Sequence, residues 1–373
     1  MHLKTLLAGL SLRSATADME TEITHISYDS RTTAPGDVFV AMTGFATDGH
    51  AYIGKAVAAG AAAVVCERPP EDSSVPYVLV ENSRRALAVM AANYYGHPAD
   101  SMTMVAVTGT NGKTTTTYLL KAILEQELGA KVGLIGTNQD LIGDEVVPTE
   151  RTTPESLELQ ELFARMRSAG CTHVVMEASS HALALDRVYG IHYAVGIFTN
   201  LTQDHLDYHG TMEAYRQAKG LLFAQSRRAV LNLDDEAGRW YRERLACPVF
   251  TYSENKDQAD LTAKGIRLYP GQVEFEAVAR EQIQRVFLPI PGGFTIYNAL
   301  AALACGLCLD IPLDKAAAPL RAVRGVKGRV EVVPVPRAYT VLIDYAHTPN
   351  ALENILMTAR DFTAGRLICL FGC

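Results

Sequence analysis

The stretch VAVTGTNGKTTTTYLL, residues 105–120, most constrains how this chain can fold. Its apolar start predicts a buried strand, and Gly109 and Gly112 then leave a tight turn without side chains. From Thr114 onward, leucine and isoleucine recur at helical spacing. A strand, a glycine loop and a helix in this order direct backbone N–H groups and a helix N-terminus at one point. Such a point suits a phosphate group.

Lys113 and Thr114 follow this loop directly. We expect Lys113 to reach the β- and γ-phosphates of a nucleotide, and the Thr114 hydroxyl to bind Mg²⁺. The usual phosphate-binding loop has a glycine five residues before its Gly-Lys pair, where this chain has Val107. A glycine turn without a ligand is the alternative, and the Lys-Thr pair argues against it.

The composition is that of an ordinary globular chain of 373 residues, long enough for roughly two or three domains. A net charge of −7 gives no basic field for nucleic acid, so anionic ligands must bind at local sites. The seven cysteines stand in apolar segments, which predicts reduced, buried thiols in the cytoplasm. Cys305 and Cys308 form a lone CxxC, which we interpret as two helix positions and not as zinc ligands. No apolar segment is long enough to span a membrane.

The first 17 residues faintly resemble a signal peptide, because Lys4 precedes an apolar run and an A-x-A follows. That run is short, is broken by Gly9 and Ser11, and ends at Arg13. The pattern therefore favours an amphipathic first helix.

Alternating strands and helices predict three α/β regions. Residues 1–98 read as a small domain, and residues 99–330 as a larger one with a mostly parallel sheet and an antiparallel excursion around Pro270-Gly271. Residues 331–373 predict two strands, a helix from Pro349 to about Phe362 and a last strand, RLICLFGC. So small a unit cannot bury a good core alone. We therefore expect it to open a third, Rossmann-like domain that is truncated.

The loop GTNGKTT has the form found in the Mur ligase and folylpolyglutamate synthetase superfamily, which this chain resembles. These enzymes join a carboxylate to an amine with ATP. The DSR of residues 29–31 and the DGH of residues 48–50 are similar to the uridine-nucleotide domain of the UDP-N-acetylmuramoyl-tripeptide synthetases in the Mur ligase family. This resemblance places Ser30 on the substrate, where the alternative is a turn-capping hydroxyl. It places the loop on ATP, through Gly109, Thr110, Asn111, Gly112, Lys113, Thr114 and Thr115.

Two further motifs resemble the family's muramoyl-peptide site. In ERTTPES, the resemblance makes Thr152 and Thr153 substrate contacts, and a helix N-cap is the alternative. In VVMEASSHALALDRV, Ser179 and Arg187 resemble the substrate-binding serine and arginine, and an arginine can pair with the D-glutamate carboxylate. Glu177 ends an apolar strand in the same motif and is a hard oxygen donor suited to Mg²⁺.

The motif NLTQDHLDYHG carries His205, which the resemblance makes a ligand of a second Mg²⁺. Zinc is the alternative, but the carboxylates and the lack of cysteine favour Mg²⁺. Lys219 would be repelled by Mg²⁺ as an ammonium, and the family's pattern implies that CO₂ carbamylates it to an anionic ligand. A surface lysine on a helix is the alternative. The resemblance also places three residues around the nucleotide, with His347 beside the last of them: Asn298, Arg329 and Asp344.

The resemblance implies a cytoplasmic, monomeric amide ligase of peptidoglycan synthesis with Lys113, Lys219 and His205 as its catalytic set. ATP would phosphorylate the glutamate side chain of UDP-N-acetylmuramoyl-L-alanyl-D-glutamate, and the amine of meso-diaminopimelate or L-lysine would attack the acyl phosphate. Three alternatives stay open: a sibling Mur ligase, a folylpolyglutamate synthetase-like ligase, or a non-catalytic nucleotide-binding fragment. We expect the residues that select the diamino acid to lie beyond Cys373, and this polypeptide alone to be inactive.

Overall fold

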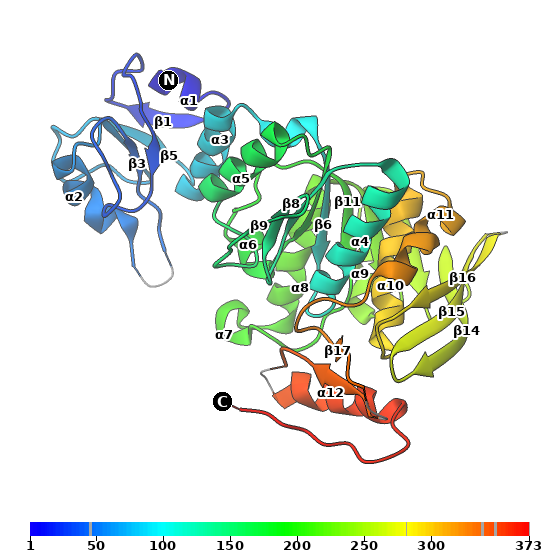
Figure 1. The fold of residues 1–373 in the computed structure, drawn as a ribbon. Helices are drawn as coiled ribbons and strands as arrows, with labels where there is room; N and C mark the ends of the chain where they lie inside the picture. Colours follow the sequence, from blue (N-terminus) through cyan, green and yellow to red (C-terminus); the bar gives the residue numbers. More distant parts are fainter. Residues whose placement is uncertain (45–46, 281, 337–338, 347–348, 373) are drawn as a thin grey trace. The chain divides into compact units, whose positions relative to one another are not determined.

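The computed structural model describes residues 1–44, 47–280, 282–336, 339–346 and 349–372 (Figure 1). The chain forms two compact units, each assembled from three segments. The first unit consists of Met1–Ser101, Pro154–Ala169 and His181–Ile191, and the second of Met102–Thr153, Gly170–Ser180 and His192–Cys373. Both are α/β, as the sequence predicted. The domain boundaries at residues 98 and 330 stay predictions.

The first unit is built on a sheet whose described strands run in the order β1-β5-β4-β3-β2. Four of them are parallel, and β1 lies antiparallel at the edge beside β5. The inner strands β3 and β4 are buried along their whole length, which explains their continuous apolar runs. The strands are β1 (Leu12–Ala15), β2 (Ile26–Ser27), β3 (Val38–Val40), β4 (Ala63–Cys66) and β5 (Tyr77–Val80); the helices are α1 (Leu3–Leu6), η1 (Gly49–Tyr52), α2 (Ile53–Ala58), α3 (Ser83–Tyr95) and η2 (Pro98–Ser101).

The prediction of an amphipathic first helix is confirmed over one turn, since α1 buries Leu3 and Leu6 and leaves Lys4 exposed. The helix α1 is one turn long, and Gly9, with φ of +83°, allows the chain to reverse soon after it. The next residues form β1, whose backbone pairs with β5. The propensity of the leucines for a helix therefore yields to strand pairing.

The helix α5 (Ser156–Ser168) comes from the middle of the sequence but belongs to the first unit. Leu157 of α5 joins the hydrophobic core that contains Leu87 and Met90 of α3. Arg167 of α5 donates hydrogen bonds to carbonyls at the end of α3, where Gly96 caps the helix in a left-handed conformation. The first core is therefore incomplete without a segment that lies outside residues 1–101.

The second unit contains a sheet whose described strands run in the order β16-β15-β14-β13-β12-β11-β6-β10-β7-β8-β9 (Figure 1). The strands from β14 to β7 are parallel, so the prediction of a mostly parallel sheet is confirmed. The predicted antiparallel excursion is confirmed in β14 and β15. The strands are β6 (Thr103–Thr108), β7 (Val132–Ile135), β8 (Asp140–Ile142), β9 (Glu145–Val147), β10 (His173–Glu177), β11 (Tyr193–Phe198), β12 (Ser226–Asn232), β13 (Val249–Ser253), β14 (Leu261–Tyr269), β15 (Gln272–Ala279) and β16 (Gln282–Leu288).

Two long helices pack side by side on this sheet: α4 (Lys113–Leu128) lies on β6, β10 and β7, and α10 (Phe294–Cys308) lies on β11, β12 and β13 (Figure 1). Leu119 and Ile123 of α4 and Leu300 of α10 are fully buried in the same core. Cys305 and Cys308 lie on α10 as unpaired thiols, as predicted. The other helices of this unit before its C-terminal part are α7 (Leu206–His209), α8 (Met212–Gly220), η3 (Leu221–Gln225), α9 (Glu236–Arg242), α11 (Leu313–Ala317) and η4 (Ala318–Ala322). The short helix α6 (Ser180–Ala184) lies, except for Ser180, in the first unit.

The C-terminal residues form an antiparallel pair, β17 (Glu331–Val333) and β18 (Val341–Ile343), and then α12 (Pro349–Asp361), as predicted. The prediction of a strand at RLICLFGC was wrong for its described residues, 366–372. No described strand pairs with this segment, so Ile368 and Leu370 are exposed and their β propensity finds no partner. His347 and Cys373 lie outside the described residues.

Candidate functional site

The glycine loop joins the end of β6 to the start of α4 in a conformation that only glycine fits. Gly109 and Gly112 have φ of +147° and +85°. A Cβ atom on Gly109 would lie 1.9 Å from Thr199 Oγ1, and one on Gly112 would lie 2.2 Å from Asn298 Oδ1. Two predicted loop glycines and the predicted nucleotide residue Asn298 therefore share one region. Thr114 and Thr115 follow in the first turn of α4, and both are buried.

Residues at the end of the neighbouring strand β11 hold this loop. Thr199 Oγ1 donates to the Asn111 carbonyl at 2.6 Å. The Asn111 N–H donates to Asn200 Oδ1 at 2.9 Å, and the Thr110 N–H donates to the Asn200 carbonyl at 2.8 Å. The role of Thr199 was not predicted from the sequence. The position of Thr199 directly after an apolar strand could have indicated this role, because parallel sheets bind ligands at the carboxyl ends of their strands.

Two lysine amines converge on one carbonyl of the loop. Lys113 Nζ donates to the carbonyls of Gly109 and Thr110, at 3.0 and 2.9 Å, and Lys219 Nζ donates to the Gly109 carbonyl at 2.8 Å. Lys219 is only 1% exposed. Removal from water, together with the neighbouring Lys113 ammonium, lowers the pKa of Lys219 well below its usual value. Removal from water also lowers the pKa of Lys113, although the Glu177 carboxylate opposes this shift.

Glu177 is fully buried at the carboxyl end of β10. Thr137 contacts both of its carboxylate oxygens, through its N–H at 2.9 Å and its hydroxyl at 3.0 Å. A Cβ atom on Gly136 would lie 2.5 Å from Glu177 Oε1, so the carboxylate is confined from that side as well. A hard oxygen donor is therefore held in one orientation near the loop lysine.

Three of the predicted substrate residues gather around Glu177. Thr152 Oγ1 lies 3.0 Å from Thr137 Oγ1. Thr153 Oγ1 donates to the Glu177 carbonyl at 2.8 Å, and the Ser179 N–H donates to Thr153 Oγ1 at 3.2 Å. The structure therefore brings Thr152, Thr153 and Ser179 together.

The donor set fits Mg²⁺ in part. Mg²⁺ keeps several waters and takes one or two carboxylates beside phosphate oxygens, and the buried Glu177 carboxylate and Thr114 hydroxyl are such ligands. His205 begins α7 with φ of +52° and is about half exposed, and its Nε2 lies 3.5 Å from Asp204 Oδ2. Within the described part of the chain, no group of three or more His, Cys, Asp or Glu side chains is close enough to hold a metal ion.

The predicted residues near the C-terminus differ in what they contact. The Arg329 guanidinium lies close enough to Lys113 to lower the pKa of that lysine further. Its Cζ lies 5.4 Å from the centre of the Tyr345 ring. Asp344 instead uses its carboxylate to accept the N–H groups of Val330 and Ala346, each at 2.9 Å, and so shapes the segment around β18.

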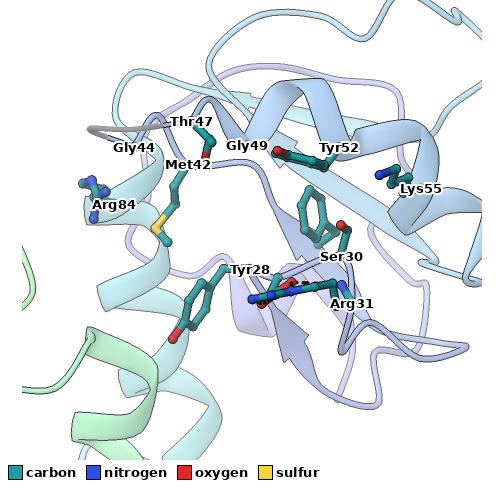
Figure 2. Close-up of a pocket in the computed structure, with 12 residues that line it drawn as sticks. Tyr28, Ser30, Arg31, Met42, Gly44, Thr47, Gly49, Tyr52, Lys55 and Arg84 are labelled. Carbon is teal, nitrogen blue, oxygen red and sulfur yellow. Dashed lines mark hydrogen bonds and ion pairs between the residues drawn. The ribbon is translucent and has the colours of Figure 1, made fainter. Parts of the chain in front are cut away.

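A pocket of about 520 Å³ lies in the first unit, and Ser30 is in its wall (Figure 2). Figure 2 shows aromatic rings and cationic side chains around the same space, with Lys55 and Arg84 on opposite sides in this view. Aromatic rings can stack on a nucleobase, and the two cations suit phosphate. The lining residues are Tyr28, Asp29, Ser30, Arg31, Phe39, Met42, Gly44, Thr47, Gly49, Tyr52, Lys55 and Arg84.

Arg187 belongs to the first unit, where it shares a carboxylate with Arg84. Its Nε lies 3.2 Å from Glu155 Oε2, and Arg84 Nη1 lies 3.4 Å from the same oxygen. All three side chains are largely buried. Two guanidinium groups therefore share the Glu155 carboxylate, a role that was not predicted from the sequence.

The fold and the loop define a class: an α/β protein that binds a nucleoside triphosphate at the carboxyl edge of a largely parallel sheet. Three family models match the chain in order: Mur ligase family, catalytic domain, over residues 22–95; Mur ligase middle domain over residues 107–306; and Mur ligase, glutamate ligase domain over residues 328–373. The chain belongs to the Mur ligase family.

Named relatives agree with this assignment. The chain is 45% identical to the UDP-N-acetylmuramoyl-L-alanyl-D-glutamate–2,6-diaminopimelate ligase of Clostridium botulinum, a match that covers 100% of this chain and 78% of the relative. A solved structure of a ligase with the same name is 26% identical, has a TM-score of 0.83, and is matched over 100% of this chain and 77% of the other. A MurF ligase from Thermotoga maritima in complex with ADP is 24% identical with a TM-score of 0.60, over 91% of this chain and 75% of the other, and shares the fold. None of the described helices is long and apolar enough to cross a membrane.

Proposed function

We propose that this chain is an ATP-dependent ligase that adds 2,6-diaminopimelate to UDP-N-acetylmuramoyl-L-alanyl-D-glutamate in peptidoglycan synthesis. The observation that carries this proposal is the 45% identity, over the whole chain, to a ligase named for that reaction. The glycine loop with its two converging lysines supports the use of ATP. We further propose that the enzyme acts as a monomer in the cytoplasm, where ATP and nucleotide-linked precursors are available.

In this reaction the γ-phosphoryl group passes from ATP to the glutamate side-chain carboxylate and forms an acyl phosphate. An amine of diaminopimelate then attacks the acyl carbon, phosphate leaves, and an amide bond remains. Loop N–H groups and Lys113 would hold the phosphates and neutralise the charge that develops on them. Asn298, Arg329 and Asp344 would complete the nucleotide site.

The substrate would be held at two places. The pocket with Ser30 has the size and chemistry for a uridine nucleotide. Thr152, Thr153 and Ser179 would contact the muramoyl peptide beside Glu177, and Arg187 would pair with a substrate carboxylate. These roles stay proposals, and they follow from the motifs and from the contacts described above.

Thr114, Glu177, His205 and Lys219 are the residues we propose to hold two Mg²⁺ ions. Bound Mg²⁺ would neutralise phosphate charge and orient the phosphoryl group for transfer. The two hydrogen bonds from Thr137 keep the Glu177 carboxylate fixed for this task.

We propose that Lys219 is carbamylated. Burial lowers the pKa of Lys219 and so makes its ammonium easier to deprotonate. The lone pair of the deprotonated amine can attack CO₂; an N–C bond forms, one proton leaves the nitrogen, and an anionic carbamate remains. Carbamylation replaces the repulsion between the Lys113 and Lys219 ammonium groups, which share the Gly109 carbonyl, with an attraction between opposite charges. A carbamate resonance in the ¹³C spectrum of protein equilibrated with ¹³C-bicarbonate, absent in Lys219→Ala, is the expected result. A spectrum without it in the wild type would contradict the modification.

The function is tested with ATP, Mg²⁺ and UDP-N-acetylmuramoyl-L-alanyl-D-glutamate. We expect ADP release that depends on this substrate, and a hydroxamate when hydroxylamine traps the acyl phosphate. With 2,6-diaminopimelate present, mass spectrometry should find the tripeptide product, and L-lysine serves as the competing diamino acid. Absence of both ADP release and hydroxamate, with substrate binding also absent in calorimetry, would refute the proposal.

A further inference from the structure

Thr137 is the one residue in the described part of the second unit that contacts both Glu177 oxygens and also Thr152. It sits just after β7, far in sequence from both partners. Its N–H reaches Glu177 Oε1 at 2.9 Å, its hydroxyl reaches Glu177 Oε2 at 3.0 Å, and the same hydroxyl lies 3.0 Å from Thr152 Oγ1. The turn that carries it is itself held, because the Gly136 N–H donates to the Asp140 carboxylate at 3.1 Å.

Counting protons fixes the direction of these hydrogen bonds. An ionised carboxylate only accepts, so the contact between the Thr137 hydroxyl and Glu177 uses the one proton of that hydroxyl. The contact between Thr137 and Thr152 must then use the proton of Thr152. Thr152 Oγ1 is left with lone pairs alone for any other partner.

We propose that Thr137 is a positioning residue that fixes the Glu177 carboxylate and makes Thr152 a pure acceptor. Thr152 then selects an N–H or O–H group of the muramoyl peptide and rejects a carbonyl or carboxylate oxygen at the same place. This inference rests on the proposed function, which places Thr152 on the substrate. The part that concerns Glu177 depends only on binding of a divalent cation and ATP.

The Thr137 hydroxyl links Glu177 to Thr152, so a change at Thr137 affects both residues. Gly136 lies so close to Glu177 that an added Cβ atom would be 2.5 Å from Oε1, and Thr137 donates to both carboxylate oxygens. Without the hydroxyl, Glu177 Oε2 loses a donor while buried, and Thr152 regains a free proton that can point at the substrate. Both the cation site and the substrate site should therefore change together.

The experiment compares Thr137→Val, which removes the hydroxyl at constant shape, with Thr137→Ser, which restores it. Mn²⁺ binding to the ATP-bound protein is measured by electron paramagnetic resonance, and binding of UDP-N-acetylmuramoyl-L-alanyl-D-glutamate by calorimetry. Thr137→Val should raise both dissociation constants at least fivefold, and Thr137→Ser should keep both within twofold of the wild type. Thr152→Val should weaken substrate binding by a similar factor. The double variant should bind the substrate no more weakly than either single variant, because each substitution breaks the same series of hydrogen bonds from Thr152 through Thr137 to Glu177.

Thr251→Val is the matched control. Thr251 also donates through both its N–H and its hydroxyl to a carboxylate, that of Asp260, but has no part in the proposed site. This control should leave both dissociation constants unchanged. Equal loss in Thr137→Ser and Thr137→Val, multiplied losses in the double variant, or unchanged Mn²⁺ binding in Thr137→Val would overturn the inference. If the wild type binds Mn²⁺ and ATP but not the substrate, the proposed function fails, while the Mn²⁺ comparison still decides the role of Thr137 toward Glu177.

Discussion

Gly112→Ala should disrupt the nucleotide site through a clash with one identified atom. Gly112 caps the N-terminus of α4 with φ of +85°, and a Cβ atom there would lie 2.2 Å from Asn298 Oδ1. Gly129 caps the other end of the same helix with φ of +59° and has open space around a Cβ atom. The two glycines therefore separate backbone strain from steric clash.

The expected magnitudes follow from these two terms. A left-handed conformation costs a non-glycine residue roughly 1–2 kcal/mol, and this strain should lower the free energy of unfolding of both alanine variants. Forcing an extra atom into a packed site costs about 1–3 kcal/mol more, and this clash should lower the free energy of unfolding of Gly112→Ala alone. We expect the free energy of unfolding to fall by ~2–5 kcal/mol in Gly112→Ala and by ~1–2 kcal/mol in Gly129→Ala.

Urea unfolding followed by Trp240 fluorescence measures this difference. Trp240 is the one tryptophan of the chain and lies on α9 in the second unit. In calorimetry, Gly112→Ala should weaken ATP binding at least tenfold, and Gly129→Ala should leave it within about twofold, a factor of ten being about 1.4 kcal/mol.

The background Asn298→Ala provides the decisive comparison, because it removes the atom that the new Cβ atom would meet. In that background Gly112→Ala should cost only the strain term, about as much as Gly129→Ala in the wild type. An undiminished cost in the Asn298→Ala background would refute the reasoning from the clash.

Three further predictions concern charged residues. Lys113→Ala should weaken ATP binding at least tenfold, or about 1.4 kcal/mol, because it removes a charged contact to the phosphates; unchanged calorimetry would contradict the loop assignment. Removal from water raises the pKa of Asp140 to about 7, so the folded state retains a proton between about pH 4 and 7 that the unfolded state has released, and the free energy of unfolding should fall as the pH rises through this window. Asp140→Asn should flatten that decline and raise the melting temperature at pH 8, whereas melting curves parallel to the wild type at pH 5 and 8 would rule out this origin. Lys55→Ala should weaken UDP binding several-fold and leave ATP binding unchanged, and equal losses for both nucleotides would count against a uridine pocket in the first unit.

Most of the sheet could be predicted from sequence, because buried parallel strands leave continuous apolar runs. The apolar stretches before Gly109 and after Thr172 became β6 and β10, and the glycine pair predicted the loop between β6 and α4. The clustering of Thr152, Thr153 and Ser179 follows from their positions beside the end of β10, but it was predicted only through the family resemblance.

The residues that sequence reasoning missed act through partners far along the chain. Thr137 and Glu155 are ordinary loop and helix-capping residues by composition, and only the folded chain brings Thr137 to Glu177 and Glu155 to Arg187. The strand expected at residues 366–372 failed for the opposite reason: its composition suits a strand, but strand formation needs a partner.

Because the first unit is assembled from three segments, no single continuous stretch of the chain contains all of its core. A fragment made of residues 1–101 alone would lack α5. The face of α3 around Leu87 would then be exposed, and the carbonyls that accept hydrogen bonds from Arg167 would lose this donor. A transfer of the pocket that contains Ser30 into another protein would therefore have to include Pro154–Ala169 and His181–Ile191. Substitutions in those two segments should therefore affect the unit that contains the pocket, although in sequence the segments lie between stretches of the second unit, which holds the glycine loop.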